Sequence, residues 1–417
     1  MAKKMELADW AAKRFEANQI FTPSTPISVA DLFAGRGEQI FRLVDAVGER
    51  GRHVILYGER GVGKTSLSQI TRFLIPVGFE QIKFIRVQCF PTDTFSTIAR
   101  KVFKEVRFNV DSEEGGQTVY DVAALYPGEI TPDDFIRELS LWNDNHIPIV
   151  VIDEFNELSD PLAPLLMANT IKALSDSATN VTLIVVGVAN DVKQLISSHE
   201  SIERCTEEIL MPRMKTDELK DIIEQRVAQL GMSITGNAKW TIINLSKGLP
   251  QYVHSLGRQA CFEAIKNKRL NIKDEDAEAA VQSLLASSDQ TFKDAYEVAT
   301  RSNQPGNLFK QVLTACALAR PDESGYFAPG WVREPLSAIV DKQIDIANFQ
   351  EHLKQFLTVK RGQILERVGE ERAYRFRFRH PAMQPYVIMR GIRENIVDEK
   401  AKQALSSPEQ GDLFPTV

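Results

Sequence analysis

The clearest chemical signal in the sequence is GERGVGKT at residues 58–65, which fits the Walker A, or P-loop, pattern G-x-x-x-x-G-K-[ST]. It follows the apolar run VILY and precedes an amphipathic stretch, which is the strand-to-helix context that this loop requires. Glycine backbones can wrap phosphates, Lys64 can reach the β- and γ-phosphates, and the Thr65 hydroxyl can ligate magnesium. We therefore expect ATP and Mg²⁺ to bind here, with nucleotide contacts from Gly58, Glu59, Arg60, Gly61, Val62, Gly63, Lys64, Thr65 and Ser66.

A predicted strand that ends in two acidic residues accompanies the P-loop. Such a loop needs a carboxylate that holds magnesium through water, and the segment IVVIDEF supplies Asp153 for this role. The next residue, Glu154, would lie near the γ-phosphate, where it could polarise the attacking water as a general base. An apolar strand that ends in Asp-Glu can also simply meet solvent, and it is the P-loop that favours the functional interpretation.

The elements that must position these residues alternate between apolar runs and helix-length amphipathic stretches from about residue 30 to residue 211. Continuous β-branched runs such as IPIVVID and VTLIVVGV are typical of strands covered on both faces, so we expect a parallel sheet flanked by helices. Gly-Gly and Pro-Gly signals predict a surface insertion at Asp111–Pro132. The predicted strands are His53–Tyr57, Lys83–Gln88, Pro148–Asp153, Val181–Gly187 and Glu207–Met211.

Helical periodicity replaces the strand signals from Thr216 to about Leu285, which predicts a small helical domain. In TDELKDIIEQRVAQLG, we expect Thr216 to cap the first helix and Gly231 to end it. A polar stretch then leads into a third, C-terminal region.

The C-terminal region predicts a winged helix, because three helical stretches precede two strands, QILERV and AYRFRFR. Alternation places aromatic and guanidinium groups on opposite faces of the second strand. Residues 360–393 hold nine Lys and Arg and three Glu, a local net charge of +6. Such a wing could contact DNA phosphates, although winged helices also bind proteins and an arginine face can simply be solvated. The predicted DNA contacts are Arg375, Arg377 and Arg379, which alternate with Tyr374, Phe376 and Phe378.

Composition argues against several protein classes. The 417 residues suit two or three domains, and the content of 43% hydrophobic and 25% charged residues argues against a disordered or fibrous chain. The net charge of −6 says little about partners. Four widely spaced cysteines without a CxxC pair predict reduced thiols and no zinc. Without a signal-peptide core or a run of roughly 18 apolar residues, a cytoplasmic protein with no membrane segment is expected.

These motifs together resemble an AAA+ ATPase of the origin-recognition and archaeal-ATPase type, with STAND ATPases as close relatives, over about residues 30–390. In that family a polar residue at the end of the fourth strand senses the γ-phosphate, and Asn190 in GVAND matches its position. An arginine before the fifth strand reaches a neighbouring subunit's ATP, and Arg204 in SIERCTEEILM occupies the matching place. Asn190 could equally be a turn residue, and Arg204 a solvated one.

Two further segments resemble nucleotide contacts of the same families. GLPQYVHSLGRQA matches the G-x-P signature of the lid, with Pro250 at its centre. Relatives often carry arginine after this proline where the chain has Gln251, and Arg258, two helical turns later, could take its place. DLFAGRGEQI is similar to an F-x-G-R-x-E start, which places Phe33–Glu38, including Arg36, near the adenine.

The predicted fold class is α/β: a parallel-sheet P-loop (AAA+) domain with a helical lid and a C-terminal winged-helix domain. The expected parts are an N-terminal extension (1–29), the nucleotide-binding domain (30–213), the lid (214–288), a linker (289–304), the winged helix (305–393) and a flexible tail (394–417). Within the tail, QGDLF (Gln410–Phe414) resembles the pentapeptide by which bacterial proteins dock on the sliding clamp, although a plain solvated tail fits as well.

The leading hypothesis is an ATP-hydrolysing AAA+ switch that forms homo-oligomers with ATP between subunits. Its winged helix would engage DNA in replication, transposition or genome defence. The alternative is a STAND-type signalling ATPase that controls a partner effector, such as a nuclease or transposase, without binding DNA. A third possibility is a regulatory subunit that binds ATP and hardly hydrolyses it.

Overall fold

The structure is a computed structural model that describes residues 6–23, 35–75, 82–111, 117–141, 147–189, 202–304, 306–370, 373–398 and 401. These residues fall into two compact units. The nucleotide unit is Pro26–Glu59 with Gly63–Met211, and the C-terminal unit is Met1–Thr25 with Arg60–Val62 and Pro212–Val417.

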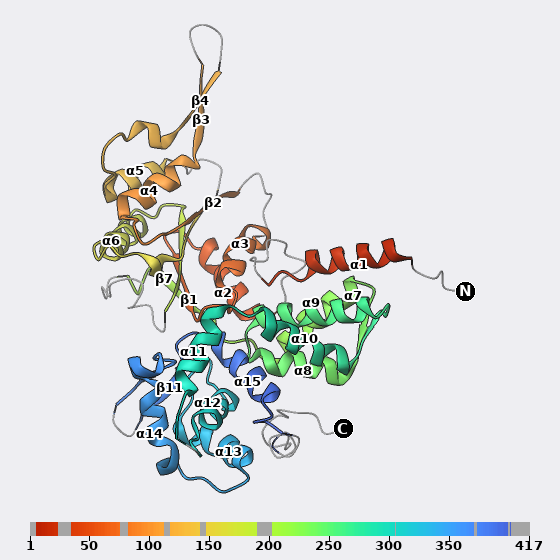
Figure 1. Cartoon of the computed structure of the whole chain (residues 1–417). Coiled ribbons are helices and arrows are strands. Elements are labelled where there is room, and N and C mark those ends of the chain that lie inside the picture. The colour runs from red at the N-terminus through yellow and green to blue at the C-terminus, as the bar shows by residue number, and fades with distance from the viewer. Residues whose placement is uncertain are drawn as a thin grey trace. The chain divides into compact units, whose positions relative to one another are not determined.

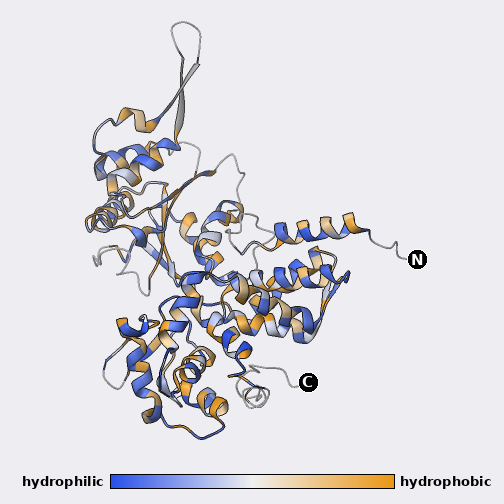
Figure 2. Cartoon of the chain, viewed as in Figure 1, coloured by the Kyte–Doolittle hydropathy of each residue, from blue (hydrophilic) through white to orange (hydrophobic). Residues whose placement is uncertain are grey.

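A five-stranded parallel sheet in the order β2-β5-β6-β1-β7 organises the nucleotide unit (Figure 1). Its strands are β1 (His53–Gly58), β2 (Ile82–Gln88), β5 (Ile147–Asp153), β6 (Thr182–Val188) and β7 (Thr206–Leu210). Each strand begins and ends within one residue of its predicted bounds, so the predicted parallel α/β sheet is confirmed. The central strands β5 and β6 are almost wholly hydrophobic (Figure 2), as expected where helices cover both faces.

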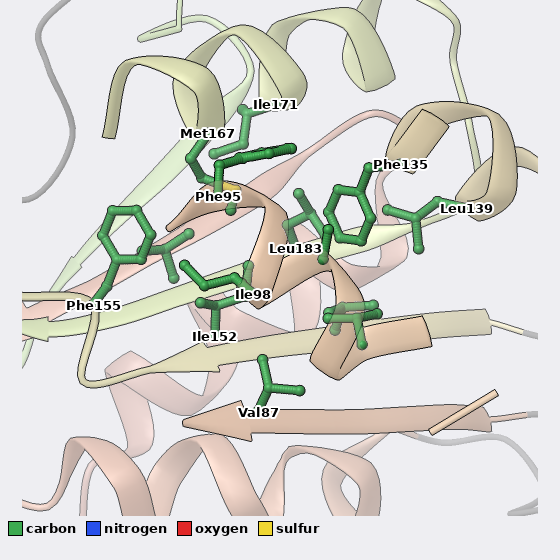
Figure 3. Close-up of a cluster of buried hydrophobic side chains, with 14 of the residues drawn as sticks. Val87, Phe95, Ile98, Phe135, Leu139, Ile152, Phe155, Met167, Ile171 and Leu183 are labelled. Carbon is green, nitrogen blue, oxygen red and sulfur yellow. The ribbon is translucent and has the colours of Figure 1, made fainter. Parts of the chain in front are cut away.

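Helices cover both faces of this sheet. On one face pack α4 (Phe95–Lys104), α5 (Pro132–Ser140) and α6 (Ala163–Asp176), whose apolar side chains form the core shown in Figure 3. Fully burying one such side chain contributes roughly 1.5–3 kcal/mol. On the strands also pack α2 (Gly37–Gly48) and α3 (Lys64–Leu74), the helix that the P-loop opens. This core holds the ends of the strands in fixed register.

The predicted surface insertion is a β-hairpin that starts earlier than expected. Strands β3 (Arg107–Asp111) and β4 (Gln117–Asp121) pair antiparallel with each other and project from the unit (Figure 1). They lead into the 3₁₀ helix η3 (Val122–Leu125) and then α5. These two strands pair only with each other and lack the long apolar runs of the central sheet. The sequence therefore predicted an insertion here but no strands.

Helices make up most of the C-terminal unit. The lid consists of α7 (Thr216–Gln229), α8 (Gly236–Ser246), α9 (Pro250–Lys266) and α10 (Asp274–Ser287), with a short parallel pair between β8 (Ser233–Ile234) and β9 (Asn271–Ile272). The prediction that Thr216 caps α7 is wrong. The N-cap is Lys215, whose backbone N–H donates to Glu218 Oε2 at 2.8 Å, so the acidic residue in the first turn supplies the cap.

The N-terminal helix α1 (Leu7–Ile20) packs against α9 of the lid. Phe21, which follows it, is fully buried and meets the imidazole of His254 edge to face at 6.1 Å between ring centroids. His254 Nδ1 accepts a hydrogen bond from the backbone N–H of Thr22 at 3.1 Å, and burial lowers the pKa of His254 to about 3. The neutral imidazole is therefore the form that accepts this bond.

The C-terminal region is a winged helix. It consists of α12 (Phe309–Leu318), α13 (Pro329–Val340), α14 (Ile346–Phe356), the short η6 (Val359–Arg361) and the hairpin β10 (Leu365–Val368) and β11 (Arg375–Phe378). Phe327 bridges to Phe376 beside the hairpin, and α15 (Met383–Arg393) follows it.

Two segments at the borders of the winged helix differ from expectation. Residues 289–304, predicted as a linker, contain α11 (Gln290–Thr300), in which Tyr296 and Ala299 are fully buried. The tail predicted from residue 394 begins with a packed turn, because Val397 is 1% exposed. Spaced apolar residues in otherwise polar stretches explain both differences, since one or two buried side chains suffice to dock a short segment. The QGDLF segment lies outside the described residues.

The docking of Phe21 against α9 is tested by Gly257→Ala. A Cβ on Gly257 would lie 2.7 Å from both Phe21 Cε1 and Ile223 Cδ1, closer than packed carbon atoms approach. We expect overpacking to lower the free energy of unfolding by about 1–3 kcal/mol, measured by urea denaturation. The control is Gly330→Ala in α13, where a Cβ would meet no heavy atom within 4 Å. Equal unfolding midpoints for both variants would show that Phe21 does not pack on α9.

Candidate functional site

The P-loop joins β1 to α3 and depends on glycine at two positions. Gly58 has a φ of 144°, and a Cβ there would lie 2.4 Å from the Met211 carbonyl oxygen. Gly63 has a φ of 100° and caps α3, and a Cβ there would meet nothing within 4 Å. Gly58 is thus required by the close approach of a neighbouring chain segment, whereas Gly63 is favoured by its left-handed backbone and leaves open space above the helix.

The Lys64 ammonium is held by the loop's own carbonyl groups. Nζ donates to the carbonyl oxygen of Gly58 at 2.9 Å and to that of Glu59 at 2.7 Å, and the residue is 8% exposed. Thr65 and Ser66 form the first turn of α3, whose N-terminal N–H groups and dipole favour an anion. A buried cation, an open glycine cradle and a helix N-terminus at one place fit a triphosphate.

Asp153 ends β5 and is 1% exposed. Its Oδ1 accepts from the backbone N–H of Glu154 at 2.9 Å, and its Oδ2 accepts from Arg86 NH2 at 2.7 Å. All strands of the sheet run parallel, so Asp153 and the P-loop lie at the same edge, the carboxyl ends of β5 and β1. Only β6 separates these two strands, which places them about 10 Å apart.

Glu154 has a left-handed backbone, with φ 55° and ψ 38°, and caps the 3₁₀ helix η4 (Phe155–Glu157). For a non-glycine residue this conformation costs about 1–3 kcal/mol and is concentrated at functional sites. The surrounding fold therefore holds the chain in an unfavourable conformation directly after Asp153.

Sequence analysis missed two residues at this edge, Arg86 and Asn156. Asn156 Oδ1 accepts from the backbone N–H of Val188, the last residue of β6, at 2.7 Å, and its Nδ2 donates to Glu157 Oε1 at 3.1 Å. This contact connects the loop after β5 to the end of β6. The available signals were a charged residue inside the apolar strand KFIRVQ and an amide three positions after Asp153.

The remaining predicted nucleotide contacts are spread over several places. Arg36 has a φ of 66°, caps α2 and is 2% exposed, whereas Phe33 and the proposed γ-phosphate sensor Asn190 lie outside the described residues. Pro250 is the first residue of α9, and Arg258 lies on the same helix, where burial lowers the pKa of its guanidinium. Their roles as nucleotide contacts stay predictions.

Arg204 lies at the end of the sheet where the strands begin, opposite to the P-loop, which lies where β1 ends. It precedes β7, which pairs with β1 in parallel so that Thr206 faces His53 and Leu210 faces Tyr57. Five residues of strand therefore separate it from the P-loop edge, roughly 17 Å. Its guanidinium is exposed and pairs with Asp176 at 2.5 Å. Arg204 cannot reach the P-loop of its own sheet.

The wing shows the predicted alternation, but two of its arginines are neutralised within the fold. Phe376 and Phe378 are buried, at 5% and 1% exposed. Arg375 pairs with Asp322 at 2.8 Å, Arg377 pairs with Glu366 at 2.5 Å, and Arg379 donates to Gln363 at 2.9 Å. Two of the three arginines that were predicted to contact DNA therefore form ion pairs within the chain.

Other features of the described residues add no second site. They contain no group of three or more His, Cys, Asp or Glu that could hold a metal ion. None of their helices has the length and apolar character needed to cross a membrane. All four cysteines are buried thiols, and burial raises the pKa of Cys89, which follows β2, to about 12.

The chain is similar to solved structures at low sequence identity. The Walker-type ATPase of Pyrococcus abyssi is 16% identical with a TM-score of 0.51, and the match covers 88% of this chain and 99% of that one. The Aeropyrum pernix ORC1 protein in complex with DNA is 16% identical with a TM-score of 0.48, covering 92% and 96%. CDC6p from Pyrobaculum aerophilum is 15% identical with a TM-score of 0.47, covering 91% and 98%.

No curated protein matches the sequence. The family described as Novel STAND NTPase 1 (nSTAND1) matches residues 26–254, more than half of the chain. That range includes the P-loop, Asp153 and Glu154, and it extends into α9 of the lid. The chain therefore belongs to the Novel STAND NTPase 1 family, and its fold is that of an AAA+ P-loop NTPase.

Proposed function

We propose that the chain is an ATP-binding and ATP-hydrolysing switch. The single observation that carries this proposal is the caged Lys64 ammonium at the N-terminus of α3, on the same sheet edge as Asp153 and Glu154. Lys64 would bind the β- and γ-phosphates, and Glu154 would orient the attacking water. Thr65 and Asp153 would hold Mg²⁺, which neutralises charge on the phosphates.

We further propose that hydrolysis depends on assembly. Arg204 is exposed, charged and remote from its own P-loop, so it can act on ATP only in a neighbouring copy of the chain. A guanidinium supplied across an interface would stabilise the charge on the transferring phosphoryl group. In the isolated chain Asp176 holds it, and assembly would exchange that exposed ion pair, which is worth at most about 1 kcal/mol, for phosphate oxygens.

The output would pass through the lid to the winged helix. Within the C-terminal unit, Arg213 NH1 donates to Gln384 Oε1 at 2.5 Å and to the Lys247 carbonyl at 3.2 Å. Gln384 Nε2 in turn donates to the Ala317 carbonyl at 2.9 Å. Arg213 and Gln384 are 8% and 1% exposed, so breaking these bonds would leave buried polar groups unpaired. The winged helix is thus built to move together with the lid.

A partner effector is one candidate target of the wing, because Asp322 and Glu366 offset the charges of Arg375 and Arg377. DNA is the second candidate. It is favoured by Lys360, Arg367 and Arg379, which remain on the exposed surface of the wing. Such a surface could contact phosphates with little sequence reading.

The roles of Lys64 and Glu154 are tested by two substitutions. Lys64→Ala should abolish ATP binding in calorimetry, because it removes the cation that the phosphates need. Glu154→Gln should keep ATP binding and lower hydrolysis about 100-fold or more, because an amide cannot take up the proton of water. Glu157→Gln removes the same charge from the same loop and should hydrolyse ATP normally. Normal turnover by Glu154→Gln would exclude it as the base.

The shared site is tested by mixing subunits. Arg204→Ala should lower hydrolysis about a thousandfold, and Lys64→Ala should be inactive. A mixture of the two variants should hydrolyse ATP faster than either alone, since one supplies an intact P-loop and the other an intact Arg204. If the mixture is no more active than its parts, Arg204 does not act in a neighbouring subunit.

The DNA candidate is tested with the exposed cations only, because removing Arg375 or Arg377 would also break internal ion pairs. If the wing binds duplex DNA, the double variant Lys360→Ala/Arg379→Ala should weaken binding and reduce the slope of log K against log salt by about 2. Lys342→Ala, two residues after the end of α13, is the control and should bind as the wild type does. Absence of any gel shift by wild-type protein at low salt would leave the effector as the target.

A further inference from the structure

Arg86 forms an ion pair with Asp153 that the proposed hydrolysis does not itself explain. The two residues lie on adjacent parallel strands, where Arg86 of β2 faces Val151 of β5 and Gln88 faces Asp153. Ile85 and Val87, on either side of Arg86, are in the hydrophobic core of the sheet. Alternation therefore directs Arg86 to the other face, and its NH2 lies 2.7 Å from Asp153 Oδ2.

Arg86 is the counter-ion of a buried carboxylate. The Asp153 side chain is 2% exposed, and a buried carboxylate without a counter-ion is strongly destabilising. The backbone N–H of Glu154 already binds Oδ1, which leaves Oδ2 to the guanidinium. Oδ2 is also an oxygen that a water on magnesium could use.

Arg86 has room to leave this position. β2 is an edge strand of the sheet, and the Arg86 side chain is 27% exposed, whereas Asp153 is enclosed. A long arginine can rotate toward solvent from an edge strand without disturbing the core. The ion pair is also not needed to join the strands, because β2 and β5 are paired along their whole length, from Ile82 with Ile147 to Gln88 with Asp153.

We propose that Arg86 is a positioning residue that orients the Asp153 carboxylate and competes with magnesium for it. The inference rests on the proposed role of Asp153 as the metal-side carboxylate. Arg86 thereby sets the Mg²⁺ concentration at which ATP is held in its metal-bound form. A positive charge next to a cation site lowers its affinity for the cation, and removing that charge raises it.

The experiment measures the Mg²⁺ concentration that half-saturates binding of a fluorescent N-methylanthraniloyl ATP. Arg86→Gln removes the charge but can still donate a hydrogen bond to Asp153, so the variant should fold. We expect it to lower the half-saturating Mg²⁺ concentration about tenfold. Arg86→Lys keeps the charge and should stay within about twofold of the wild type. Lys83→Gln removes one cation from the same strand without touching Asp153 and should match the wild type.

The outcomes separate this inference from the proposed function. In one outcome the wild-type protein binds the nucleotide, and Arg86→Gln needs the same or a higher Mg²⁺ concentration. That result would overturn the role of Arg86 and leave the nucleotide site intact. The same tenfold shift in Arg86→Lys would also overturn it, because charge would then not be the cause. Wild-type protein that binds no nucleotide at any Mg²⁺ concentration would overturn the proposed function and this inference together.

Discussion

The parallel register of β1, β6 and β5 is the constraint on which the candidate site depends. Because all three strands run the same way, their carboxyl ends deliver the P-loop, the segment after Val188, and the pair Asp153 and Glu154 to one edge. A reversal or a shift of one strand would move its functional residues to the other edge or the other face. The apolar cores on both faces, which pin the register, are therefore also what keeps the chemistry in place.

At the carboxyl ends of these strands, internal contacts occupy the charged groups. Backbone carbonyls of Gly58 and Glu59 hold Lys64, and Arg86 holds Asp153. Binding a nucleotide with its metal would then be an exchange of partners rather than a first pairing, since buried charges need partners in both states. Such an exchange would favour two discrete states of the site. The charged groups would have partners in each state, whereas they would lack partners at positions between the two.

Local sequence patterns were enough to predict the P-loop, the five strands of the parallel sheet, the helical lid and the winged helix. Each of these has a characteristic periodicity of apolar residues or a fixed spacing of motif residues. What they missed depends on contacts between distant segments. Arg86 and Asp153 are 67 positions apart, and Arg375 and Asp322 are 53 apart. A count of charges could not show that Arg375 and Arg377 are paired within the fold, because Asp322 lies outside the counted segment and the Glu366 contact depends on how the two strands of the hairpin pair. Helix α11 was not predicted for the same reason, because its few apolar residues pack against α15 and α12, which lie elsewhere in the sequence.

Arg204 lies before the first residue of β7, at the end of the sheet opposite to the P-loop. A parallel sheet has two edges, and the proposed catalytic groups are divided between them, with the P-loop at one and Arg204 at the other. A single chain would therefore hold two half-sites that can never meet, whatever the lid does. If Arg204 acts on a neighbouring chain, as proposed, stacking identical chains would join each half-site to its complement, and ATP turnover would depend on assembly. In such a design the weak surface ion pair to Asp176 is an advantage, because a buried one would resist the exchange.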